Sequence, residues 1–284
     1  MKNRESCEDS QEIRMRLACL LMLLGLVFSG PARADMPIAE WQYSAGQVLQ
    51  GYFQQPVPRW QRLVSAGPAL LPRYEGASAY RAMPGLTLEM RYRDLAFAST
   101  AEGLGLNLLR GKRYRAGVAA GFDLGRDEDD DPRLRGLGDL DPAAELKLFG
   151  ECVLFPVVLR ADLRRNLGSG GGWSADLAAY LPVVGSERYF VFLGPSMTLS
   201  DGEATRRGFG ISPQQAARSQ FPAYQAGGGL RSAGFGVSAT WFLDERWFLN
   251  GTGGLQYLLG AAADSPLSRN DQQYALSLML GYRW

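Results

Sequence analysis

Charged side chains recur at every second residue in several apolar segments, and their types suit either acid–base chemistry or ion pairing. We expect one set to line a polar interior: Glu89, Arg91, Arg115, Asp123, Glu145, Lys147, Arg160, Asp162, Arg164, Asp176 and Arg283. Paired carboxylates can hydrolyse glycans. Carboxylates interleaved with arginines more often form ion pairs, because an enclosed charge needs an opposite charge or water. The sequence therefore predicts a paired, non-enzymatic interior.

Other residues capable of chemistry are few. The 284 residues include no histidine, which excludes Ser-His-Asp triads and histidine zinc sites. The acidic run Asp127–Asp131 could bind calcium, but it lacks EF-hand spacing, and we expect a solvated loop. For Cys152 we expect a lipid-facing or interfacial position, and for the glycine-rich residues 167–172 a hairpin loop. We predict no catalytic residue, metal or cofactor.

The start of the chain has the features of a secretory signal peptide. Arg14 and Arg16 precede the apolar stretch Leu17–Phe28, and an Ala-Arg-Ala sequence ends at Ala34. We therefore assign residues 1–34 to a signal peptide, with Met15 as an alternative start. Residues 35–59 are predicted to be a periplasmic lead-in, and residues 60–284 the folded domain.

The elements that position the charged residues are predicted to be β-strands. Apolar and polar residues alternate with a period of two, which indicates strands whose faces meet different surroundings. We expect strands at 60–72, 80–92, 95–100, 104–109, 113–125, 143–154, 156–166, 173–184, 188–200, 229–243, 246–259 and 273–284. The hairpin at 95–109 is the least certain; it could instead be one long strand, in which case residues 41–53 could supply the missing partner strand.

Two features favour a transmembrane barrel over a soluble sandwich. Short connections alternate with long ones near 126–141, 201–225 and 260–272, as in outer-membrane barrels. Aromatic residues also gather beside the short turns, where a membrane–water boundary suits them: Tyr92, Tyr114, Tyr189, Trp241, Trp247, Tyr282 and Trp284. We predict a closed, antiparallel, all-β transmembrane barrel of about twelve strands (alternatively ten), with a polar interior and with the last strand paired to the first.

Several loop segments resemble a known family. Five stretches resemble signatures of the MltA-interacting protein (MipA/OmpV) family: Leu71–Pro84, Gly125–Asp141, Phe209–Gly234, Gly260–Arg269 and the terminal LGYRW. The likeness runs from about residue 60 to the end, although this chain ends in Trp where Phe is more usual and has a long N-terminal lead. The resemblance implies an outer-membrane protein of Gram-negative bacteria and transfers no catalytic residue.

The same resemblance implies a scaffold that joins a lytic transglycosylase to a penicillin-binding protein in peptidoglycan biosynthesis. A narrow channel or ligand-uptake barrel for small solutes is the alternative, because the charged interior could line a pore. The expected partners are outer-membrane lipid and possibly these two enzymes. Nucleic acid is not expected, since the formal net charge is only +1.

Overall fold

The computed structural model describes residues 58–186 and 188–284, and twelve strands hold more than half of these described residues. The predicted signal peptide, the alternative start at Met15, nearly all of the lead-in and the alternative partner strand 41–53 lie outside the described residues. The strands are β1 (Trp60–Pro72), β2 (Tyr80–Tyr92), β3 (Ala96–Ser99), β4 (Gly103–Arg110), β5 (Tyr114–Asp123), β6 (Ala143–Leu154), β7 (Val157–Asn166), β8 (Trp173–Gly185), β9 (Tyr189–Ser200), β10 (Gly229–Phe242), β11 (Trp247–Leu258) and β12 (Gln272–Arg283).

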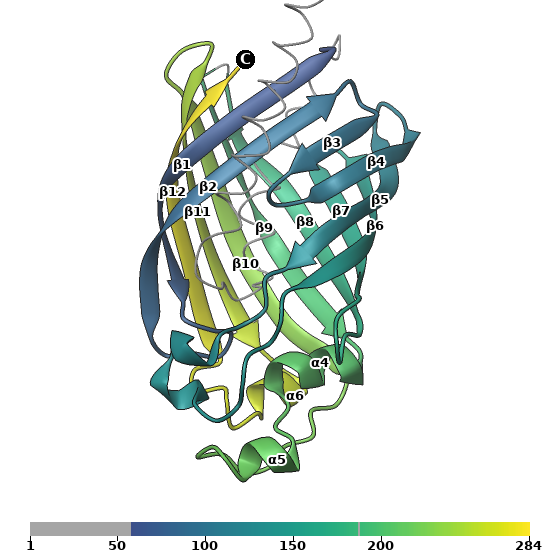
Figure 1. Ribbon diagram of the computed structural model, residues 1–284. Helices are drawn as coiled ribbons and strands as arrows, with labels where there is room; N and C mark the ends of the chain where they lie inside the picture. The colour runs from purple at the N-terminus through teal and green to yellow at the C-terminus, as the bar shows by residue number, and fades with distance from the viewer. Residues whose placement is uncertain (1–57, 187) are drawn as a thin grey trace, which may run out of the picture. The chain divides into compact units, whose positions relative to one another are not determined.

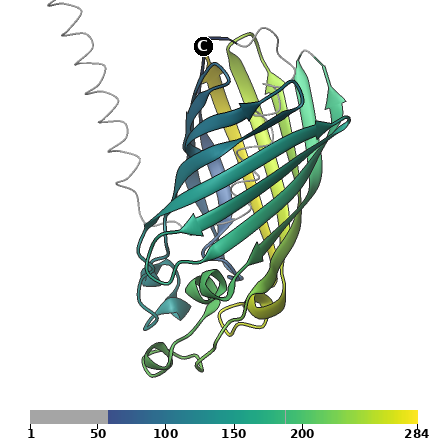
Figure 2. The ribbon, with the colours of Figure 1, turned by 90° about the vertical axis from the view of Figure 1, so that its right-hand side faces the viewer.

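The strands form one closed antiparallel barrel, which confirms the predicted fold and the count of twelve. Each strand pairs with its neighbour along the chain, and β12 closes the ring on β1 from Leu63↔Arg283 to Leu70↔Leu276 (Figures 1 and 2). Closure is what strands facing hydrocarbon require, because lipid cannot pair with the backbone groups of an open edge.

The barrel has two unlike ends. The short-turn end is made by residues 93–95, 111–113, 155–156 and 243–246, together with Ser186 and Arg188. The C-terminus also lies at this end (Figure 1). The long-loop end is made by residues 73–79, 124–142, 167–172, 201–228 and 259–271. This end carries η1 (Glu128–Asp130), η2 (Pro132–Leu134), α4 (Gly202–Phe209), α5 (Pro213–Ala216) and α6 (Gly260–Ala263). None of the helices in the described ranges is long and apolar enough to cross a membrane.

The outer face of the barrel is apolar. On β12, Leu276, Leu278 and Leu280 are 52%, 55% and 46% exposed, while Ala275 and Met279 are buried. The aromatic residues expected at an interface all lie beside the short turns. Tyr114, Tyr189, Trp241, Trp247 and Trp284 are exposed there, and Tyr92 and Tyr282 are half-buried.

One part of the wall is shorter than the rest. The β3–β4 hairpin stops part-way along the barrel, so β2 pairs with β3 only from Glu89 to Tyr92 (Figure 1). The uncertain segment 95–109 is thus a real hairpin, and its strands are shorter than the roughly 9–11 residues usual for a spanning strand.

Candidate functional site in the barrel lumen

Arg160 on β7 is the centre of a buried charge network in the lumen. Its guanidinium lies 2.7 Å from the Glu102 carboxylate, 2.8 Å from Glu151 and 2.7 Å from Asp162. All four side chains are at most 8% exposed. The Glu102 contact joins the tip of the β3–β4 hairpin to β7, three strands further round the wall. A planar guanidinium suits this role, because its fixed fork of donors can serve several carboxylates at once.

The network continues to both sides of Arg160. Arg91 on β2 pairs with Glu89 and with Glu102, and it lies over the Phe97 ring with 5.1 Å between guanidinium carbon and ring centroid. Arg115 on β5 pairs with Glu151 at 2.7 Å. Charges from β2, β5, β6 and β7 therefore converge through alternate ion pairs.

A second cluster lies nearer the long loops. Arg164 pairs with Asp176 at 2.7 Å and with Glu145 at 3.5 Å, while the Thr198 hydroxyl donates to Asp176 at 2.7 Å. Asp123 meets Arg207 of α4 at 3.2 Å, which ties the lumen wall to a helix of the 201–228 loop.

The structure brings most of the predicted interior charges together, with one exception. Glu89 and Asp176 are half-buried members of the clusters above. Eight further residues of the predicted set are buried: Arg91, Arg115, Asp123, Glu145, Lys147, Arg160, Asp162 and Arg164. Arg283 instead lies at the short-turn end, where it donates to the Glu245 carbonyl at 2.9 Å and lies over the Phe242 ring.

Two members of the network were missed in the sequence. Glu151 continues the parity of Glu145 and Lys147 on β6, so the alternation rule could have found it. Glu102 lies in the turn between β3 and β4, where no period indicates which way a side chain points.

The lumen is not uniformly polar, and the expectation of a polar interior is wrong near the short turns. There Val153, Val158, Tyr180 and Phe192 form one buried cluster. The ring centroids of Phe242 and Phe248 are 6.1 Å apart, and those of Phe97 and Phe149 are 5.6 Å apart with an angle of 65° between the ring planes. Apolar side chains therefore fill much of this half of the lumen.

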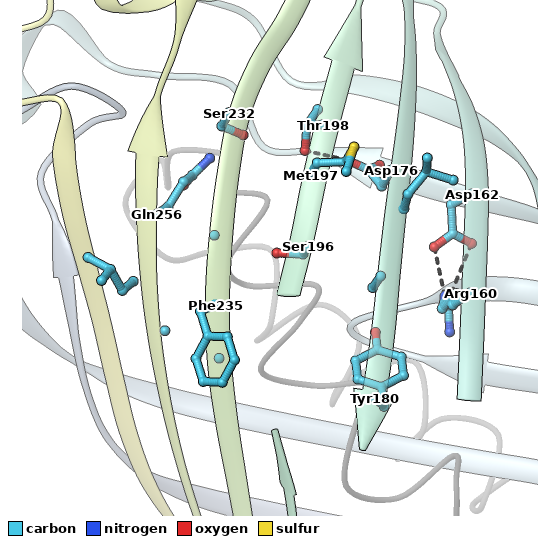
Figure 3. A pocket seen from close by; sticks show the side chains of 16 residues that line it. Arg160, Asp162, Asp176, Tyr180, Ser196, Met197, Thr198, Ser232, Phe235 and Gln256 are labelled. Carbon is cyan, nitrogen blue, oxygen red and sulfur yellow. Dashed lines mark hydrogen bonds and ion pairs between the residues drawn. The ribbon is translucent and has the colours of Figure 1, made fainter. Parts of the chain in front are cut away.

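The remaining wall is lined by hydroxyl and amide groups. On β8–β12 the buried polar residues include Ser174, Thr198, Ser200, Ser232, Ser238, Thr240, Asn250, Thr252, Gln256 and Gln273. A cavity on this side is lined by polar groups that include Arg160, Asp162, Asp176, Ser196, Thr198, Ser232 and Gln256 (Figure 3). The polar lining of this cavity thus combines neutral side chains with charged side chains that are paired within the protein.

At the other end of the barrel the long loops pack on one another. Four different loops contribute side chains to one buried cluster, which consists of Tyr74, Ala77, Leu134, Leu137, Ile211, Phe221 and Leu267. A second cluster joins Phe209, Ala226, Leu258 and Ala262. The Tyr74 hydroxyl donates to the Leu267 carbonyl at 3.2 Å, and burial raises the pKa of this phenol. We call this assembly of loops the cap.

The acidic run belongs to the cap and is less solvated than expected. Asp127 and Asp131 cap the two 3-10 helices, Asp130 pairs with Arg81, and Glu128 accepts backbone hydrogen bonds from two glycines. Asp131 is buried, and of the five residues only Asp129 is exposed. Within the described ranges, no group of three or more Cys, Asp or Glu residues is arranged to hold a metal ion.

The geometry of the lumen favours ion pairing between its own side chains. Each carboxylate of the Arg160 network pairs with at least one guanidinium. Its oxygens therefore already accept hydrogen bonds from the protein and need none from a ligand.

Comparison with known proteins gives one family and several distant structures. The family model described as MltA-interacting protein MipA matches residues 64–284. No curated protein gives a significant match. The COG4313 outer membrane channel from Pseudomonas putida F1 is 11% identical, with 81% of this chain and 97% of that chain covered and a TM-score of 0.42. OmpT of Vibrio cholerae is 7% identical (79% and 97% covered, TM-score 0.37), and the Neisserial surface protein A is 8% identical (81% and 98% covered, TM-score 0.25).

Proposed function

The chain belongs to the MltA-interacting protein MipA family, and we propose that it is an outer-membrane barrel that serves as a scaffold for peptidoglycan-remodelling enzymes. In this proposal the apolar belt lies in the outer membrane of a Gram-negative bacterium, with the short turns in the periplasm. The partners would be a lytic transglycosylase, as the family description suggests, and a penicillin-binding protein.

The observation that carries the proposal is the filling of the lumen. The cap packs over the long-loop end, and apolar side chains occupy the short-turn half. Between them, Arg160 and Glu102 join β7 to the hairpin tip. A barrel obstructed at three levels is better suited to present its surfaces than to pass solutes.

The short-turn end offers a surface suited to a periplasmic partner. Exposed basic side chains gather on it: Arg59, Arg62, Arg93, Arg110, Lys112, Arg113, Arg188 and Arg246. Such a patch would steer a partner with an acidic face and would set the rate of association more than the final affinity.

Co-purification tests the scaffold proposal. A doubly substituted chain, Lys112→Glu with Arg113→Glu, is compared with Arg135→Glu plus Arg218→Glu, two exposed cap residues at the opposite end. We expect the first pair to reduce recovery of both enzymes from detergent-solubilised envelopes, and the second pair to leave it unchanged. A further comparison with and without residues 35–59 assigns any contribution of the lead-in. If the parent chain recovers neither enzyme, the scaffold proposal is wrong.

The second candidate is a narrow channel or ligand-uptake barrel, and the charged wall and the polar cavity favour it. Liposome swelling with small sugars distinguishes it from the scaffold. Swelling at a rate above that of empty liposomes would support passage through the lumen.

A further inference from the structure

We propose that the outer face of the barrel, where β12 closes on β1, binds the phosphate of an anionic phospholipid in the leaflet beside the short turns. We call this surface the seam site, and it consists of Arg62, Arg93 and Arg246 with the rings of Trp60, Tyr92, Trp247, Tyr282 and Trp284. It lies on β2, β1, β12 and β11, which are neighbours in the wall (Figure 1). The inference rests on the membrane placement proposed above and concerns lipid, not the protein partners.

The aromatic residues of the seam site form a row across the four strands. Trp60 of β1 is the register partner of Tyr92 of β2, and their ring centroids are 4.7 Å apart. Trp247 of β11 is the partner of Tyr282 of β12 at 5.0 Å, and the Trp284 ring lies 5.8 Å from that of Tyr282. Amphipathic rings favour the boundary between hydrocarbon and headgroups. The row therefore marks the headgroup level on these strands.

Arg62 lies on the lipid-facing side of β1. Ser65 is buried in the lumen, so the alternation of the strand places Arg62 on the outer face together with Val64 and Ala66. Its guanidinium carbon lies 5.4 Å from the centroid of the Trp60 ring, so the side chain reaches from the apolar face toward the short turns. An arginine that extends in this way covers apolar surface with its stem and keeps its charge among the headgroups.

The other two arginines lie in the turns beside the seam and contact rings of the same row. The guanidinium carbon of Arg93 lies 5.6 Å from the centroid of the Tyr92 ring. Nη1 of Arg246 donates to the Tyr282 hydroxyl at 3.2 Å. A guanidinium has five N–H donors in a planar fork that matches the oxygens of a phosphate. Three such groups along one aromatic row therefore suit a phosphodiester whose acyl chains follow the wall.

The backbone of Arg93 supports a use for its side chain. Its φ is 49°, and it is the one non-glycine residue with a positive φ in the described ranges. Glycine adopts this conformation without strain, whereas other residues are uncommon there. Backbone strain of this kind gathers at sites of function. A long cationic side chain at a position that suits glycine points to a role for the charge.

The protein supplies no counter-charge to the seam site. Among the described residues, no carboxylate lies within ion-pair distance of any of the three guanidinium groups. Two carboxylates of the adjoining turns accept hydrogen bonds from other groups: Asp244 from two backbone N–H groups at 2.6 and 2.7 Å, and Asp94 from the Asn107 amide at 3.3 Å. A bound phosphate would provide the missing negative charge.

A similar contact near the long loops differs in this respect. The guanidinium carbon of Arg165 lies 5.4 Å from the centroid of the Trp173 ring, but Arg165 also contacts the Glu203 carboxylate at 3.9 Å. The cation at that boundary therefore already has a negative neighbour. We expect a preference for anionic lipid at the seam site and little contribution from Arg165.

The position of Arg62 favours a lipid over an acidic protein. Arg62 stands on the wall between Val64 and Trp60, where an approaching periplasmic protein would meet lipid first. The basic residues that test the scaffold proposal, Lys112 and Arg113, lie in the β4–β5 turn, outside the four strands of the seam. The two proposals are thus tested with different residues.

The test is native mass spectrometry of the full chain in detergent micelles that contain equal amounts of phosphatidylglycerol and phosphatidylethanolamine with the same acyl chains. We expect the parent to retain more of the anionic phosphatidylglycerol than of the zwitterionic lipid. Arg62→Gln and Arg246→Gln should each lower this ratio about fivefold, the effect of one basic residue at an anionic membrane surface. Arg165→Gln is the matched control and should leave the ratio unchanged.

Arg93→Gly is the variant least exposed to a folding defect. Glycine fits the positive φ at this position, so the midpoint of urea unfolding should stay the same or rise. The lipid ratio should fall all the same, because the cation is lost. A purely structural role of Arg93 would not produce this combination.

Three results would overturn the proposal. The first is equal retention of the two lipids by the parent, and the second is a ratio that Arg62→Gln and Arg93→Gly both leave unchanged. The third is loss of the preference when sodium phosphate is added in large excess, which would identify a free anion as the ligand. Retention of neither lipid would contradict the membrane placement as well, whereas equal retention contradicts the seam site alone.

Discussion

Replacing Arg160 by alanine should destabilise the barrel strongly, because three buried carboxylates contact this one guanidinium. Glu102 and Glu151 keep a second arginine, Arg91 and Arg115 respectively, so the loss is that of one shared partner and not of every ion pair. The contacts to Glu102, Glu151 and Asp162 are 2.7 to 2.8 Å long, and all the side chains involved are at most 8% exposed. Removing one partner of a buried ion pair leaves an uncompensated charge and costs about 3–5 kcal/mol. We expect a loss of free energy of unfolding in this range.

The neighbouring Arg165 provides the matched control. It lies on the same strand and contacts Glu203 at 3.9 Å, with side chains 36% and 56% exposed. Pairs of this kind contribute about 0.2–1 kcal/mol. Arg165→Ala should therefore change the free energy of unfolding several-fold less than Arg160→Ala.

Arg160→Lys separates charge from geometry. Lysine keeps the positive charge but lacks the fork that meets Asp162 through Nε and a terminal nitrogen. We expect a loss between those of the two alanine variants. The assay is urea unfolding in lipid vesicles followed by tryptophan fluorescence. A loss below about 1 kcal/mol for Arg160→Ala would refute the reasoning, because it would show that water screens the network.

Three further predictions concern the belt, the cap and a helix end. Leu278→Arg, in the middle of the apolar belt, should reduce the free energy of unfolding in vesicles by about 2–4 kcal/mol; an unchanged value would mean that this face does not meet lipid. Leu134→Ala, at a fully buried site in the cap, should lower its stability by about 2–5 kcal/mol and speed proteolysis of the loops, and unchanged cleavage would argue against a packed cap. Burial raises the pKa of Asp201, but backbone N–H groups, foremost that of Ala204, outweigh this and lower it overall. The stabilisation that the ionised Asp201 side chain gives the N-terminus of α4 is thus present above the ordinary aspartate pKa and lost as the pH falls through the lowered value. Hydrogen exchange at the Ala204 amide between pH 5 and 2.5 should show this loss in the parent chain and not in Asp201→Asn.

The strands were predictable because alternation is a local property. Each strand of the barrel has two unlike surroundings, so its period of two is visible in the sequence. At β3 only four residues form the strand, which is too short for the alternation to be clear, and this hairpin is the least certain part of the prediction. The same rule placed Arg115 and Lys147 on the inner face, and it would have placed Glu151 there had it been continued to the end of β6.

The cap and the full network could not be predicted in this way. Loop residues such as Tyr74 and Leu134 have no period, and their burial depends on contacts between segments far apart in the chain. Glu102 joins the network only because a hairpin tip happens to meet β7. The apolar filling near Phe242 was missed because both faces of these strands are apolar there, so alternation does not distinguish them.

Conductance of the purified full chain in planar bilayers tests the central claim most directly, namely that the cap, the Arg160 network and the apolar side chains obstruct the lumen. We predict no steady ionic current in the parent chain at moderate voltage. A steady, voltage-independent conductance would contradict the account, because ions would then be crossing a lumen that these three features should close.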